Sequence, residues 1–279
     1  MIKIIKKIKK INDLLDFYSI SILLLIILII FLLFINHNKK ITNNKKVFLT
    51  YGNDVFKKSR ERIKNEAESL NLFDDYIIET DKTILNDKEF KNCLNNSYFN
   101  KVFHEKKGGG YWLWKPYIIH KTLNKMNNGD ILVYCDAGCV INNNDSTKEK
   151  FIEIFNDLNN DRYNMILNKY GDNEKMWSKG DALKYHGIYN NEKILNEVQY
   201  EGGRIILIKN DITMKIINKW WETAKNQPQL FDDSKSNIPN KKEFKGNRHD
   251  QTNISILCKL NNKCIGGDLN FIDAQRKRE

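Results

Sequence analysis

The sequence predicts an α/β domain with a mainly parallel sheet flanked by helices. Residues 46–52 are rich in β-branched and aromatic side chains and end at a glycine, which is typical of a strand, and residues 75–80 form a second such run. Residues 54–73 lie between them and repeat apolar side chains at helical spacing. These side chains belong to Phe56, Ile63, Ala67 and Leu70. A strand, a helix and a strand in this order form a βαβ unit, which requires parallel strands.

The same alternation continues along the rest of the chain. Helical spacing predicts further helices at 115–126, 148–158, 211–224 and 248–260. The first of these has Pro116 in its first turn, where proline is favoured. Apolar runs predict further strands at 131–135, 163–170 and 203–210. We therefore expect one domain over residues 47–279.

Ahead of this domain, residues 17–36 carry an apolar run in which Ser21 is the only polar residue between 20 and 35. With a rise of ~1.5 Å per residue, a helix of this length nearly spans a hydrocarbon core of ~30 Å. A cleaved signal peptide is the alternative, but its apolar region is shorter and ends at a small-residue cleavage site. The sequence therefore favours a signal anchor at 17–36 in contact with membrane lipid, between a cytoplasmic tail (1–16) and a polar stem (37–46). A slight excess of lysines before the anchor favours a single-pass protein of type II, with a cytoplasmic N-terminus.

The net charge of +11 over 279 residues raises the question of nucleic-acid binding. The lysines, however, are spread over the whole chain among Asp, Glu and many Asn residues, and no zinc-finger spacing occurs. No nucleic-acid partner is therefore expected. The five cysteines include no Cys-x-x-Cys pair, which argues against a structural zinc site. We expect buried small hydrophobic residues; a disulfide in an oxidising lumen is the alternative, and the sequence does not pair the cysteines.

One carboxylate stands at the end of a predicted buried strand. Asp136 follows residues 131–135 directly, and Gly138 comes two positions later. In open α/β sheets, ligands bind outside the carboxyl ends of the strands. The position suits a ligand-binding carboxylate, but on this stretch alone an aspartate that caps a helix or forms a turn is an equal alternative.

Two other stretches carry side chains suited to a ligand. In residues 106–117, three glycines precede aromatic rings and a lysine, which together suit a sugar or base ring beside a phosphate: Tyr111, Trp112, Trp114 and Lys115. The alternative is that the tryptophans lie in the core and the glycines form a hinge. In residues 247–257, polar side chains crowd the first turn of a helix: Arg248, His249, Asp250 and Gln251. The histidine can ligate a metal or bond a phosphate, and the aspartate can orient a hydroxyl group.

The order GGYWLWKP, GDILVYCDAG and RHDQ resembles a family of glycosyltransferase-like proteins with the GT-A fold, over about residues 47–262. The resemblance implies a Rossmann-like sheet and an enzyme that moves a sugar from a nucleotide-diphosphate sugar to a hydroxyl group of a glycan, protein or lipid. In this family a D-x-D motif follows such a strand, and its carboxylates hold a divalent metal. Asp136 matches the first carboxylate, whereas Gly138 stands in place of the second.

This departure leaves three alternatives for the diphosphate of the donor. Asp136 and His249 can hold Mn²⁺ or Mg²⁺ together with substrate phosphates. Otherwise, cations stabilise the leaving group directly, for which the candidates are Lys115, Arg204 and Arg248. The third alternative is the loss of metal binding or of catalysis, which would leave a membrane-anchored binding protein with this fold.

The resemblance also implies roles for further residues. Donor and nucleotide binding is expected of Asp136, Gly138, Lys115, Trp112, Trp114, Tyr111 and Arg248. The candidates for deprotonating or positioning the acceptor hydroxyl are Asp250 and Asp181. Acceptor binding is expected of Trp177, Gln199, Gly202 and Gly203, with an ordinary loop as the alternative for each. Two further tryptophans in the predicted helix 211–224 are expected to pack in the core: Trp220 and Trp221.

Overall fold

The computed structural model describes residues 22, 25–30 and 44–275, and it divides the chain into two units, Met1–Asn43 and Asn44–Glu279. In the first unit, residues 22 and 25–30 are helical and exposed. Within the described residues, no helix is long and apolar enough to cross a membrane. The tail predicted at 1–16 and most of the anchor predicted at 17–36 and of the stem predicted at 37–46 lie outside the described residues.

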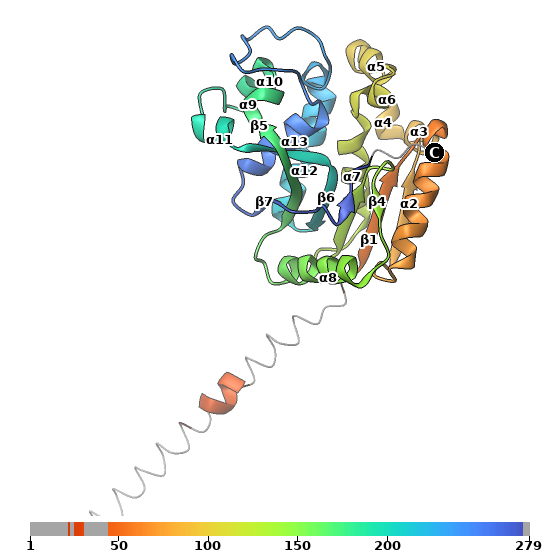
Figure 1. Cartoon of the computed structure of the whole chain (residues 1–279), viewed down its shortest axis with the longest axis vertical. Helices are drawn as coiled ribbons and strands as arrows, with labels where there is room; N and C mark the ends of the chain where they lie inside the picture. The colour runs from red at the N-terminus through yellow and green to blue at the C-terminus, as the bar shows by residue number, and fades with distance from the viewer. Residues whose placement is uncertain (1–21, 23–24, 31–43, 276–279) are drawn as a thin grey trace, which may run out of the picture. The chain divides into compact units, whose positions relative to one another are not determined.

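The second unit is built on a six-stranded sheet with the order β2-β1-β3-β6-β5-β7 (Figure 1). The strands are β1 (Lys46–Tyr51), β2 (Asp75–Glu79), β3 (Ile131–Cys135), β5 (Met165–Asn173), β6 (Val198–Ile208) and β7 (Cys264–Gly267). β1 runs parallel to β2 and β3, and β5 runs parallel to β7. β6 is antiparallel to both of its neighbours, β3 and β5. The α/β class and the mainly parallel pairing are confirmed, and the reversed direction of β6 is the feature that the sequence did not predict.

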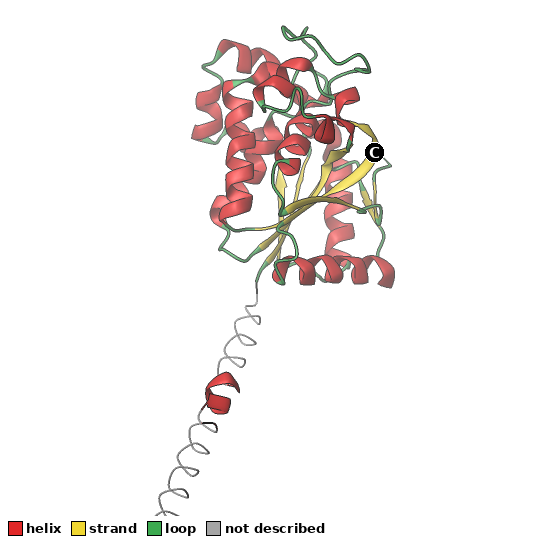
Figure 2. Ribbon diagram, turned by 90° about the vertical axis from the view of Figure 1, so that its left-hand side faces the viewer, coloured by secondary structure: helices red, strands yellow, loops and turns green. Residues whose placement is uncertain are grey.

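Helices cover both faces of this sheet (Figure 2). One face packs against α7 (Trp114–Lys125), α12 (Asp211–Asn226) and α13 (Asp250–Lys259). The other face packs against α2 (Lys57–Ser69) and α8 (Asp145–Asn159). β3 is buried on both faces because its side chains alternate: Leu132 and Tyr134 belong to the first core, and Val133 belongs to the second.

Several short elements were not predicted. Between β2 and α7 lie α3 (Asp81–Leu85), α4 (Lys88–Cys93), α5 (Ser97–Phe103) and α6 (Gly108–Tyr111). Between β5 and β6 lie α9 (Glu174–Trp177), α10 (Gly180–Tyr185) and α11 (Glu192–Asn196). Single 3-10 turns occur at η1 (Asp54–Phe56) and η2 (Pro228–Leu230), and a second, two-stranded sheet pairs β4 (Val140–Ile141) with β8 (Ile272–Asp273). Elements this short carry too few apolar repeats for a periodic signal.

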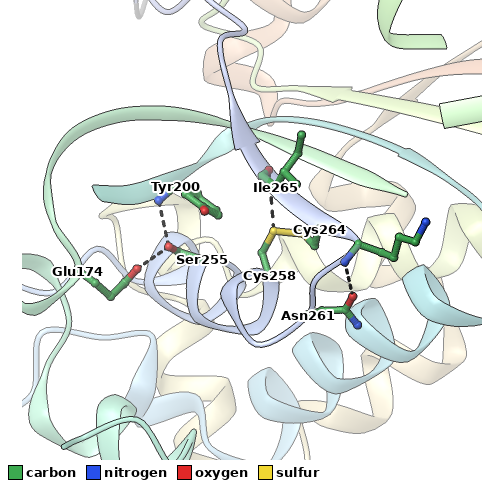
Figure 3. The surroundings of a disulfide bond; sticks show 8 residues. Glu174, Tyr200, Ser255, Cys258, Asn261, Cys264 and Ile265 are labelled. Carbon is green, nitrogen blue, oxygen red and sulfur yellow. Dashed lines mark hydrogen bonds between the residues drawn. A yellow bond between two sulfur atoms is a disulfide. The ribbon is translucent and has the colours of Figure 1, made fainter. Parts of the chain in front are cut away.

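The cysteines divide into two groups. Cys258, near the end of α13, forms a disulfide with Cys264 at the start of β7 (Figure 3). The Cα atoms of this pair lie 5.0 Å apart because the chain turns back directly after the helix. Cys135 and Cys139 are free and buried, as expected of small hydrophobic residues, and Cys93 is free and partly exposed. The disulfide that the sequence left open as an alternative is therefore present between Cys258 and Cys264.

Candidate functional site

Three predicted site residues from distant parts of the chain meet at one ammonium group. Lys115, in the first turn of α7, is almost completely buried, with 2% of its side chain exposed. Its Nζ lies 3.2 Å from Asp136 Oδ1 and 2.7 Å from Asp250 Oδ2. We call Lys115, Asp136 and Asp250 the ionic triad. The triad joins the start of α7, the end of β3 and the start of α13.

The end of β3 fixes the position of Asp136. The backbone N–H of Asp136 donates to the carbonyl of Gly203 at 2.9 Å, which continues the pairing of β3 with β6. The hydroxyl of Tyr134 donates to Asp136 Oδ1 at 2.6 Å. Oδ1 is thus held by Tyr134 and Lys115, whereas Oδ2 has no hydrogen-bond partner among the described residues. Because 37% of the Asp136 side chain is exposed, this carboxylate can meet a ligand.

Gly202 and Gly203 form the floor beneath the two carboxylates. A Cβ atom on Gly202 would lie 2.8 Å from Asp250 Oδ2, and one on Gly203 would lie 2.8 Å from Asp136 Oδ2. Side chains at these two positions would therefore displace the carboxylates. Both glycines, which were predicted to bind the acceptor, therefore lie next to the triad.

Burial and charge oppose each other within the triad. Burial disfavours the ammonium of Lys115, but the nearby carboxylates of Asp136 and Asp250 outweigh it and raise the pKa of Lys115. Burial raises the pKa of Asp250 to about 6, although Lys115 acts against this shift. In the described part of the chain, Asp250 Oδ2 faces this ammonium and has no well-aligned hydrogen-bond donor. Two carboxylates thus share one cation, which leaves a negative charge when all three groups are ionised.

A left-handed segment leads into α7. Five consecutive residues have positive φ angles: Gly108 (60°), Gly109 (56°), Gly110 (90°), Tyr111 (51°) and Trp112 (57°). A Cβ atom on Gly110 would collide with the carbonyl group of Phe103, so no larger residue fits there. The sequence predicted that the three glycines belong to a ligand site or form a hinge; at Gly110 the close neighbour is the backbone of α5.

This segment places two aromatic rings against His249. The ring centroids of Trp112 and His249 lie 5.4 Å apart with an interplanar angle of 21°, and those of Tyr111 and His249 lie 4.9 Å apart. His249 itself has a φ angle of 57°, which is unfavourable for a residue with a side chain. Its Nδ1 lies 2.7 Å from the carbonyl of Phe231 and donates to it. Because burial lowers the pKa of His249 to about 4, the ring is neutral at pH 7 and its Nε2 carries a lone pair.

The site offers few protein ligands for a divalent metal. In the part of the chain that the structure describes, no group of three or more His, Cys, Asp or Glu residues is arranged to hold an ion. The ammonium of Lys115 already lies between Asp136 and Asp250. Asp136 Oδ2 is the open carboxylate oxygen, and oxygen ligands suit Mg²⁺ and Mn²⁺. These residues therefore fit an ion that takes most of its ligands from a substrate and from water.

Three predicted residues are occupied by structural contacts. Trp114 is 4% exposed and stacks on Tyr51, with ring centroids 3.7 Å apart. Gln199 is completely buried, and its amide donates to Glu174 at 2.8 Å. Arg204 is buried and donates to the carbonyl of Ile272 at 2.6 Å, so its guanidinium group anchors the C-terminal segment.

The remaining predicted residues are Trp177 at the end of α9, Asp181 in the first turn of α10, and Arg248 in the loop before α13. The guanidinium of Arg248 stacks 4.0 Å from the ring centre of Trp177. The two carboxylate oxygens of Asp181 accept hydrogen bonds from the backbone N–H groups of Asn237 and Ile238, at 3.0 and 2.9 Å. Among the described residues, the hydrogen bonds of the Trp177 and Asp181 side chains go to residues outside the ionic triad.

Two residues that hold the end of β3 and the following turn in place were not predicted. Tyr134 lies two positions before Asp136, so strand alternation already put both on one face. The turn that carries Gly138 is held by Arg62, which donates to the carbonyls of Ala137 at 3.1 Å and Cys139 at 3.0 Å. Arg62 was not predicted, because it belongs to α2, which is far from this turn in the sequence.

No family model and no curated protein matches the chain. Solved structures do. One is a glycosyltransferase involved in the glycosylation of the major capsid of PBCV-1, at 11% identity and a TM-score of 0.43, with 82% of this chain and 85% of the other covered. Another is mouse xyloside xylosyltransferase 1 in its apo form, at 10% identity and a TM-score of 0.39, with 80% and 85% covered. At these values the likeness alone assigns neither activity nor substrate.

Proposed function

We propose that this chain transfers a sugar from a nucleotide-diphosphate sugar to a hydroxyl group of a glycan, protein or lipid acceptor. The observation that carries the proposal is the Asp136 carboxylate at the carboxyl end of β3. Tyr134 and Lys115 hold one of its oxygens, and the other lies beside Gly203 with no hydrogen-bond partner among the described residues. Fixed carboxylates at this edge of an α/β sheet are placed where ligands bind. The sequence blocks that resemble the GT-A family support the same assignment.

Each residue of the triad has a separate role in this proposal. Asp136 Oδ2 accepts hydrogen bonds from hydroxyl groups of the donor. Lys115 is neutralised by two carboxylates, so it positions them and does not contact the diphosphate. Asp250, with a pKa of about 6, is mostly ionised at pH 7 and can accept the proton of an acceptor hydroxyl. A divalent metal, when bound, offsets the charge of the diphosphate, and Asp136 with substrate phosphates would hold it.

A binding protein without turnover is the second candidate. The observation that favours it is Gly138, which stands where the resemblance implies a second carboxylate. Such a protein would bind nucleotide sugars and release no product. Binding without release therefore separates the two candidates.

The test uses the full chain with a panel of nucleotide sugars and Mn²⁺ or Mg²⁺, and it measures donor binding and release of the nucleoside diphosphate. We expect release from at least one donor, and we expect Asp136→Asn to lower the rate by about 100-fold, the range for loss of a key charged group. The matched control is Asp161→Asn, which removes an exposed carboxylate paired with Lys263. Absence of binding to every donor, or full activity of Asp136→Asn, would contradict the proposal.

A further inference from the structure

A second feature of the domain is an open polar cavity of about 470 Å³. It lies where α5, α10, the end of α12 and the segment 228–237 meet. Its volume is within the range of small-molecule sites, ~300–1,000 Å³. The lining residues are Asn96, Tyr98, Asp181, Asn226, Pro228, Gln229, Ser234, Lys235 and Asn237.

The lining favours a neutral ligand rich in hydroxyl groups. Most of the lining residues carry an amide or hydroxyl group, which both donates and accepts hydrogen bonds. One carboxylate, Asp181, and one ammonium, Lys235, balance in charge, so the cavity is not built for a phosphate or another anion. Apart from the ring of Tyr98 and Pro228, no large apolar surface is available for a lipid chain. Carbohydrate is the class of ligand with this chemistry.

The walls of the cavity are fixed by internal contacts. Asp181 holds the backbone N–H groups of Asn237 and Ile238, as described above. The hydroxyl of Tyr98 donates to Asp232 Oδ2 at 2.7 Å, and Asp232 Oδ1 pairs with the buried ammonium of Lys179 at 3.1 Å. A cavity whose walls are already ordered loses little conformational entropy when it binds.

The same segment also connects the cavity to the ionic triad. Ser234 lines the cavity, and its neighbour Asp233 forms an ion pair with Lys107 at 2.8 Å. Asp233 Oδ1 lies 3.7 Å from Nε2 of His249, the residue directly before Asp250. The segment that lines the cavity therefore also contacts His249, the N-cap residue of α13.

We propose that this cavity is a carbohydrate-binding site that takes the part of a glycan acceptor distant from its reacting hydroxyl group. The role as an acceptor site rests on the function proposed above, whereas carbohydrate binding can be measured without any transfer. The proposal also places Asp181 at the acceptor, as a residue that shapes this cavity.

The experiment measures binding of the full chain to an array of neutral gluco-, manno-, xylo- and N-acetylglucosamine oligosaccharides. Gln229→Trp fills the cavity and is expected to lower binding at least tenfold. Gln229→Ala and Asn226→Ala, which only remove amides, are expected to lower it about threefold each. The matched control is Asn156→Trp, in a different cavity of about 410 Å³ beside α8. Thermal melting of each variant shows whether it is folded, and if Gln229→Trp is not, the two alanine variants decide.

Three outcomes are decisive. Binding that is weakened by the Gln229 and Asn226 variants and kept in Asn156→Trp and Asp161→Asn supports the proposal. Binding to no oligosaccharide, or equal loss in Asn156→Trp, overturns it. Binding of nucleotide sugars is measured on the same samples, so that failure of the cavity proposal is distinguished from failure of the glycosyltransferase proposal.

Discussion

At the scale of single residues, the proposed chemistry depends on the open oxygen of Asp136. Gly203 leaves room for this oxygen, since a Cβ atom would lie 2.8 Å from it. Gly203→Ala is therefore expected to push the carboxylate aside and lower the transfer rate about tenfold, which corresponds to about 1.4 kcal/mol of transition-state free energy. Rates are compared with those of Gly246→Ala, where φ is not positive and the nearest contact of a Cβ atom would be an ordinary one at 3.7 Å. Equal transfer rates in the two variants would show that Asp136 Oδ2 has no role in the reaction.

The raised pKa of Asp250 predicts a pH dependence. A group with a pKa of about 6 is neutral below this value and charged above it. If the charged form accepts the proton, the rate rises with pH through about 6, and Asp250→Asn lacks this rise. The same shift has the opposite effect on stability, because the pKa is higher in the folded than in the unfolded chain. The contribution of Asp250 to the free energy of unfolding therefore falls between pH ~4 and ~6. Rate profiles from pH 5 to 8 and urea-unfolding profiles from pH 4 to 8 test both signs.

The identity of the triad residues could be predicted, but their contacts could not. Lys115, Asp136 and Asp250 were each singled out by the motifs that carry them. Lys115 was expected to face a phosphate, yet it is buried between two carboxylates. That arrangement depends on how α7 and α13 approach the end of β3, which is a property of tertiary packing. Trp114 stacks in the core for the same reason.

At the scale of elements, alanine substitutions in the left-handed segment before α7 measure how much its backbone conformation contributes to stability. Gly109→Ala places a side chain at positive φ with only an ordinary contact, 3.8 Å to Nε1 of Trp114, and is expected to cost about 1–2 kcal/mol in free energy of unfolding. Gly110→Ala adds a collision with the carbonyl of Phe103 and is expected to cost more than Gly109→Ala. Urea unfolding of the two variants measures the difference. Equal costs would show that the approach to Phe103 is relaxed in solution.

The disulfide is expected to stabilise the end of α13. It links Cys258 to Cys264 across a short turn, and the helix that it holds carries Asp250 at its other end. Closing a loop of 6 residues is expected to contribute about 2 kcal/mol to the free energy of unfolding. Urea unfolding with and without a reductant should differ by this amount, and a Cys258→Ser, Cys264→Ser chain should not respond to the reductant. A reductant effect that persists in that chain would contradict this assignment.

The long elements were predictable and the short ones were not. β1, β2 and β3 lie at their predicted places because buried runs with β-branched side chains are a strong local signal. The strand predicted at 203–210 corresponds to β6, which covers Val198–Ile208 and so begins earlier than predicted. Its antiparallel direction could not be predicted, since an apolar run looks the same in both directions. The helices between β2 and α7 are too short for a periodic pattern.

At the scale of the whole molecule, we propose that residues 17–36 anchor the chain in a membrane with the N-terminus in the cytoplasm. The run of apolar residues carries this proposal. In cell fractionation, the full chain should stay with membranes after alkaline carbonate washing, and a chain that lacks residues 1–43 should be released. Release of both chains would contradict the anchor.

The distribution of charge fits this picture of the domain. The net charge of +11 arises from lysines spread over the sequence, and the site itself holds two carboxylates for one buried lysine. Because the site is negatively charged, it is expected to bind a negatively charged diphosphate donor more tightly when divalent cations are present. Donor affinity should therefore fall when divalent metal is removed by a chelator.

The most direct test of the central claim is a crystal structure of the chain with a nucleoside diphosphate and Mn²⁺. The account predicts that the diphosphate lies at the carboxyl end of β3 and that Asp136 contacts the ion or the nucleotide. A nucleoside diphosphate bound elsewhere, with Asp136 untouched, would contradict it.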